Sequence, residues 1–155
     1  MAGYSHAPTR EDSDVIGSRI VAQIIDNIIA FVLFFVILAV VGGIGGILGG
    51  ATNSSGIMGA FGLLGFLLAF VATIGYGLLL EGFWDGKTVG KALLGIKVVK
   101  EDGGECDIGA AAIRNVLEII DGLFYYVVGF AFMASSDKRQ RLGDRIAGTV
   151  VVSSE

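Results

Sequence analysis

The chain has few of the residues from which most proteins build reactive sites. Its 155 residues include a single cysteine, Cys106, and a single histidine, His6. One cysteine excludes an intrachain disulfide and a cysteine-built metal site. With one histidine as well, a zinc or haem centre has almost no ligands to draw on. We therefore expect neither a metal nor a cofactor.

Charged side chains are also scarce, and they are unevenly distributed. They make up 17% of the chain, where about 25% is usual for a soluble domain. Between Ile20 and Leu80 the only Asp, Glu, Lys or Arg is Asp26. Such a run exceeds the roughly 20 apolar residues that cross a bilayer, so we expect a protein of the cell membrane. A net charge of −4 without a basic stripe argues against a nucleic-acid partner.

The apolar segments predict an all-α integral membrane protein. We expect a polar N-terminal arm over residues 1–17, loosely ordered in water. Transmembrane helices are predicted over residues 19–41 and 57–80. A third helix is predicted over residues 113–134, and it either spans the bilayer or re-enters it.

Residues 81–112 are predicted to form a cytoplasmic loop. Residues 86–95 are typical of a turn and a short surface helix. The β-branched residues 96–100 precede a glycine-containing turn and residues 106–108, a pattern that predicts a small β-hairpin. The strand-like residues 148–153 could pair with this hairpin.

Glycines recur where the first predicted helix ends. Gly42, Gly46 and Gly50 have small-xxx-small spacing, and so do Gly45 and Gly49. In lipid this spacing lets helix backbones approach closely, which favours a homo-oligomer or a partner membrane protein. Alternatively, the glycines only unwind the helix end.

The distribution of Lys and Arg predicts the topology. They lie in the N-terminal arm, the middle loop and the C-terminal tail, and the linker between the first two helices has none. The positive-inside rule then places the N-terminus, the loop and the tail in the cytoplasm. A single crossing by residues 113–134 would leave the basic tail outside, and the segment is too short for two crossings of roughly 20 residues each. A re-entrant or interfacial third helix that returns to the cytoplasm satisfies the charge rule, whereas a third span breaks it.

Two octapeptides share the pattern R-x-V-x-x-I-I-D. The first runs from Arg19 to Asp26 and the second from Arg114 to Asp121. Seven residues are nearly two helical turns, so each Arg and Asp share a face about 10.5 Å apart along the axis. That distance is too long for a salt bridge within one helix.

The arginines therefore need other partners, and residues at i+4 are in reach. Arg19 can reach Gln23, and Arg114 can reach Glu118. Because an intramembrane carboxylate is expensive, Asp26 is a candidate functional residue. Together with Asp121 it could share a proton or hold a cation. The alternative is that these polar groups only hold helices together.

An enzyme is not expected. The acidic residues Glu118, Asp121 and Asp144 have no nucleophile, histidine or metal ligand set near them in the sequence. General acid–base chemistry needs such a reacting partner.

Four blocks of sequence resemble the RDD family, small prokaryotic membrane proteins named for one arginine and two aspartates. The blocks are residues 18–27, 87–104, 112–115 and 141–151. The resemblance implies a membrane domain over residues 18–152, followed by a tail of residues 153–155. It assigns the family's arginine to Arg19 and its aspartates to Asp26 and Asp144, and leaves Asp121 as an extra acidic position. Asp144 could pair with Arg19 and close the cytoplasmic side, and the alternative is a charged loop held by water.

Two functions fit these features. The resemblance implies a membrane protein for which transport of an unidentified ligand has been suggested, so one hypothesis is an oligomeric transporter that uses Asp26. The other is a non-transporting scaffold or accessory subunit that packs through its glycine faces. Both are multi-pass proteins with a cytoplasmic N-terminus and the lipid bilayer as a partner.

Overall fold

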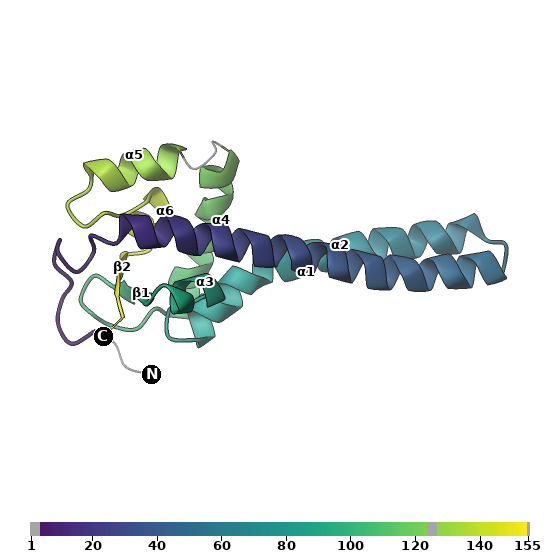
Figure 1. Ribbon diagram of the computed structural model, residues 1–155, viewed down its shortest axis with the longest axis horizontal. Helices are drawn as coiled ribbons and strands as arrows, with labels where there is room; N and C mark the ends of the chain where they lie inside the picture. Colours follow the sequence, from purple (N-terminus) through teal and green to yellow (C-terminus); the bar gives the residue numbers. More distant parts are fainter. Residues whose placement is uncertain (1–3, 124–126, 155) are drawn as a thin grey trace. The chain divides into compact units, whose positions relative to one another are not determined.

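A computed structural model describes residues 4–123 and 127–154, without the side chains of residues 120–123 and 128. The elements in chain order are α1 (Ile16–Ala51), α2 (Ser55–Phe83), α3 (Val89–Leu93), β1 (Ile96–Lys100), α4 (Ile108–Leu123), α5 (Val127–Ser135), α6 (Leu142–Ile146) and β2 (Thr149–Ser153) (Figure 1). The chain divides into two compact units. We call residues 27–76 the hairpin unit, and residues 1–26 with 77–155 the base unit.

The hairpin unit consists of most of α1 and α2. Its helices meet closely at glycines, because a Cβ at Gly45 would collide with Phe61 and one at Gly49 with Met58. The glycine-rich stretch is therefore helical as far as Ala51. The interpretation that these glycines unwind the helix end is wrong, and the first helix is longer than the predicted 19–41.

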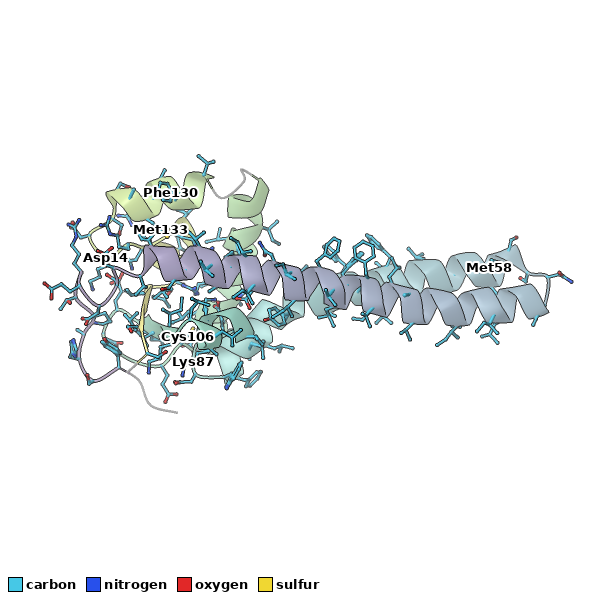
Figure 2. All side chains as sticks on the ribbon, viewed as in Figure 1. Asp14, Met58, Lys87, Cys106, Phe130 and Met133 are labelled. Atoms are coloured by element: carbon cyan, nitrogen blue, oxygen red, sulfur yellow. The ribbon has the colours of Figure 1, made fainter. Side chains whose placement is uncertain are left out.

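The outer surface of the hairpin unit is apolar. Phe31, Ile47 and Val71 are each about two-thirds or more exposed, at 65%, 74% and 66%. In Figure 2 the side chains along this part of α1 and α2 are nearly all carbon. Among the described residues, α1 and α2 are the two helices that are long and apolar enough to cross a membrane.

The base unit is built around a two-stranded antiparallel sheet. Val98 of β1 lies opposite Val151 of β2. One face of the sheet packs against Ala22 of α1 and Ala110 of α4. The pairing of the C-terminal strand with residues 96–100 is thus as expected. The predicted hairpin with residues 106–108 is reduced to a single bridge between Val99 and Glu105.

The N-terminal arm covers the other face of the sheet instead of lying loose in water. Tyr4 packs against the cluster of Val99, Val150 and Val152, and its N–H donates to the Gly103 carbonyl at 2.7 Å. These contacts explain why both strands are buried on both faces.

In the segment expected as a third helix over 113–134, the described residues 113–123 and 127–134 are helical and belong to α4 and α5. The inner side of α4 packs against α6, which in turn packs against β2. Through this packing the base unit brings α1, α2, α3, α4 and α6 around one group of charged side chains.

Candidate functional site

Asp144 lies at the centre of a buried group of charged residues in the base unit. Its residue is fully buried, and it lies in the first turn of the short helix α6. The backbone N–H of Arg141 donates to Asp144 Oδ2 at 2.9 Å, which caps this helix. Gly143 lets α6 approach α4, because a Cβ there would lie 3.3 Å from the Arg114 carbonyl oxygen.

Two arginines share the Asp144 carboxylate. Arg19 Nη2 donates to Oδ2 at 2.6 Å, and Arg114 Nη1 donates to Oδ1. Arg19 is 8% exposed and Arg114 only 2%. The expected pairing of Asp144 with Arg19 is confirmed, and Arg114 joins it.

The remaining donors of the two arginines are mostly used as well. Arg19 Nη1 donates to the carbonyl of Arg139 at 2.8 Å, a residue held at a positive φ of 51°. Arg114 Nη1 also donates to Thr149 Oγ1 at 3.1 Å. Arg114 Nη2 has no hydrogen-bond partner among the described residues.

A second buried carboxylate extends the network toward α3. Glu81, near the end of α2, is 2% exposed. Its Oε2 accepts from Arg114 Nε at 3.0 Å, and its Oε1 accepts from Lys91 Nζ. We call Arg19, Glu81, Lys91, Arg114 and Asp144 the buried network.

The electrostatics of the buried network hold Asp144 ionised. Burial alone would raise the pKa of its carboxyl, but the charges of Arg114, Arg19 and Arg141 outweigh burial and lower this pKa below its usual range. Removing one member of such a buried group leaves an uncompensated charge and is strongly destabilising. The network therefore fixes α1, α4 and α6 to one another.

Asp26 fastens α1 to a different helix. It is 7% exposed, and its carboxylate accepts the Thr88 hydroxyl at 2.5 Å and the Gly90 N–H at 2.8 Å. These donors lie at the N-terminus of α3, where backbone N–H groups lack partners within the helix. A Cβ at Gly90 would collide with the Ala22 carbonyl and the Asp26 carboxyl, so only glycine permits this approach.

The two R-x-V-x-x-I-I-D segments do converge, but not through the contacts expected within each helix. Gln23 Nε2 donates to Glu118 Oε1 at 2.6 Å, so the two i+4 residues contact each other. Glu118 also accepts from Arg141 at 3.4 Å. The expected Arg19–Gln23 and Arg114–Glu118 pairs are replaced because both arginines turn to Asp144. Asp121 lies on α4, and its side chain falls outside the described part of the structure.

Four residues of this region were not predicted from the sequence to be site residues: Thr88, Gly90, Lys91 and Glu81. The first three belong to one block that carries the family resemblance, K-T-V-G-K. Glu81 is the first charged residue after a run of more than 50 residues without charge. Its position was a signal for a buried ion pair, since a carboxylate there needs a partner.

The arrangement is suited to holding helices together. Both oxygens of Asp144 and both oxygens of Glu81 accept from cationic side chains. A transported cation would have to displace arginines that are themselves buried, at the cost of leaving them unpaired. In this arrangement the network joins α1, α2, α3, α4 and α6.

Comparison with known proteins places these motifs in a family. The model of the RDD family matches residues 15–148. The chain is 35% identical over 86 residues to "Uncharacterized protein YxaI" of Bacillus subtilis, covering 56% of this chain and 55% of that protein. It is 38% identical over 84 residues to "Uncharacterized protein YckC" of the same organism, covering 49% and 53%.

A third similar protein is "Proline-rich antigen" of Mycobacterium leprae, with 31% identity over 104 residues, 64% of this chain and 40% of that protein. The chain thus spans about half the length of the curated relatives that it matches. No solved structure matches it.

Proposed function

The chain belongs to the RDD family of membrane proteins, and on that premise we propose that it is a non-transporting, non-catalytic membrane scaffold. The hairpin unit is its anchor, and the base unit is a cytoplasmic module that the buried network holds in shape. The observation that carries this proposal is the Asp144 carboxylate, whose two oxygens are each occupied by a buried arginine.

The dimensions of the hairpin unit support its role as an anchor. Residues 27–51 of α1 rise about 37 Å and residues 55–76 of α2 about 33 Å at 1.5 Å per residue. The hydrocarbon core is about 30 Å thick. No Asp, Glu, Lys, Arg or His lies within residues 27–76, so the anchor crosses without a charge.

The contacts within the base unit support a shared side for both ends of the chain. Arg19, ahead of the hairpin, contacts Asp144 behind it, and Asp26 contacts Thr88. All 11 Lys and Arg residues lie outside the hairpin unit, which favours the cytoplasmic side. The strand β2 follows the third segment and pairs with β1, which precedes it, and this pairing supports a third segment that returns.

The same features argue against the transporter hypothesis. A polar pathway across hydrocarbon needs polar or ionisable groups along its length, and the hairpin unit has no charged residue to supply them. Asp26, the residue on which transport was to depend, accepts two hydrogen bonds from the start of α3. It therefore has a structural role that requires no ion.

One side of the anchor has room for a partner. Among the described residues, nothing lies within 4 Å of a Cβ built at Gly42, Gly46 or Gly50, whereas Gly45 and Gly49 are used between α1 and α2. Small residues at i and i+4 let a second helix approach closely in lipid. A second copy or a partner membrane protein could pack there.

An ion-flux assay in proteoliposomes separates the two functions. We expect wild type, Asp26→Asn and the exposed control Asp14→Asn to give the same proton, sodium and potassium leak as vesicles without protein. A flux in wild type that Asp26→Asn abolishes and Asp14→Asn preserves would overturn the scaffold and restore the transporter.

The topology has its own test. A reporter that is active only in the cytoplasm, fused after Glu155, is expected to be active, because β2 pairs with β1 in the base unit. The same reporter inserted at Asn53, in the turn between α1 and α2, is the matched control and is expected to be silent. Silence at both positions would show that residues 113–134 cross the membrane, and the reverse pattern would show that the whole protein is inverted.

A further inference from the structure

Helix α4 has a charged residue on its buried side and apolar residues on its exposed side. Its inward side carries the charged Arg114, which is 2% exposed, while Ile113, Val116 and Ile119 are 40%, 60% and 50% exposed. The three apolar residues recur every third position and so share one face of the helix. A helix at an aqueous surface shows the opposite pattern, with the charged face outward.

Helix α5 also exposes apolar side chains. Val127 and Phe130, three residues apart, are 66% and 51% exposed, whereas Met133 is 6% exposed. Phe130 and Met133 are both labelled on α5 in Figure 2. No charged residue occurs in α5, so its outer face offers water no charged group.

The inner side of α4 runs beside the last turns of α2. A Cβ at Gly82 would collide with Ile108, and one at Gly77 would collide with the Asn115 side chain. The helices α4 and α2 therefore run in opposite directions past each other over Ile108–Asn115 and Gly77–Gly82.

We propose that the outer faces of α4 and α5 lie against the acyl chains of the cytoplasmic leaflet, as an interfacial wedge that does not cross the bilayer. The occupant is lipid because Asn115 of α4 lies beside Gly77 of α2, the residue that directly follows the charge-free segment 27–76 in the sequence, and because an amphipathic interfacial helix such as α4 buries its apolar face about 5–10 Å into the leaflet. The proposal rests on the proposed anchor but not on the scaffold role.

The test uses the full chain in proteoliposomes of phosphatidylcholine and phosphatidylglycerol. Cys106, the only cysteine, is changed to Ala, and single cysteines for an environment-sensitive fluorophore are introduced at Val116 and Phe130. Phe35→Cys on the anchor is the lipid control, and the exposed Glu105→Cys is the water control. Quenching by bromine-labelled acyl chains is compared with quenching by aqueous iodide.

We expect bromolipid quenching at Val116 and Phe130 within about twofold of that at Phe35, and iodide quenching about fivefold below that at Glu105, as for a face buried in the leaflet. Iodide quenching equal to that at Glu105 would overturn the wedge while leaving the anchor intact. If Val116 is shielded from both quenchers and crosslinks to a second copy, the face is a dimer contact and the wedge is likewise overturned. Loss of bromolipid quenching at Phe35 as well would overturn the anchor itself.

Discussion

The two units of this chain place charge and apolar surface in opposite ways. The hairpin unit has no charged residue, and its large apolar side chains point outward. The base unit buries Arg114 and Asp144 almost completely, and only part of its apolar surface is exposed. The hairpin unit thus has the surface of a segment in lipid, whereas the base unit has a charged interior.

The two units are stabilised by different interactions. In the hairpin unit the helices satisfy their own backbone groups, so close packing at glycines is what joins α1 to α2. In the base unit the short elements α3 and α6, of five residues each, could not form alone. Asp26 and Asp144, both bonded at their N-terminal turns, hold them in place.

The largest effect is expected from breaking the buried network. Asp144→Asn leaves Arg19 and Arg114 without a full counter-charge, and removing one partner of a buried ion pair typically costs about 3–5 kcal/mol. We expect proteolysis within the base unit of the protein in detergent micelles, while residues 27–76 stay protected.

Asp137→Asn is the matched control, because that carboxylate is fully exposed and 3.7 Å from Arg10. It should leave the protease pattern unchanged. Equal sensitivity of the two variants would mean that the buried network does not stabilise the base unit.

A smaller effect is expected in the hairpin unit, and it should depend on which glycine changes. Gly45→Ala forces a Cβ into Phe61 and should destabilise the contact of α1 with α2 by about 1–3 kcal/mol through overpacking. The Cβ of Gly46→Ala would lie in open space, so this variant should leave the contact of α1 with α2 intact. Thermal unfolding followed by helical circular dichroism measures both, and identical melting of the two variants would refute the assigned face.

Gly46→Leu extends this prediction to assembly. A larger side chain on the open face should lower the oligomeric or partner-bound fraction without melting the hairpin, and the volume-conserving Ile47→Leu should not. Crosslinking in native membranes measures that fraction. No difference between these two variants would remove the glycine face from the proposal.

The smallest effect is expected from low pH, which should destabilise the base unit and leave the hairpin unit unchanged. The pKa of Asp144 is lower in the folded protein than its usual value, through its arginine partners. Its stabilisation is therefore complete above the unfolded pKa of about 3.9 and is lost as the pH falls below it. Hydrogen exchange of β1 and β2 should accelerate below about pH 4 relative to intrinsic rates. Residues 27–76 hold no carboxyl side chain and should show no such change, and parallel acid loss in both units would contradict this origin.

Much of the hairpin unit could be predicted from the sequence because a bilayer requires a single, simple pattern. The charge-free run predicted both long helices, and the strand-like residues after Gly148 predicted the pairing with residues 96–100. Helix ends were less accurate, since glycine is tolerated inside a helix that packs closely in lipid.

The site was partly predictable for a different reason. The resemblance identified Arg19, Asp26 and Asp144, and the shared octapeptide pointed to Arg114. The partners of each residue depend on tertiary contacts between distant parts of the chain, such as Arg114 with Glu81. Local i+4 spacing therefore gave the wrong pairs, because a buried carboxylate attracts arginine more strongly than a neighbour on a helix surface.

A double-mutant cycle between Arg19 and Asp144 tests the structural role of the buried network most directly. The free energy of unfolding in detergent is measured for wild type, Arg19→Met, Asp144→Asn and the double variant, with Arg10 and Asp137 as the surface pair. We expect a coupling of about 2–3 kcal/mol for the buried pair and no measurable coupling for the surface pair. A coupling for Arg19 and Asp144 as small as that of the surface pair would contradict the role of these residues as the structural lock of the base unit.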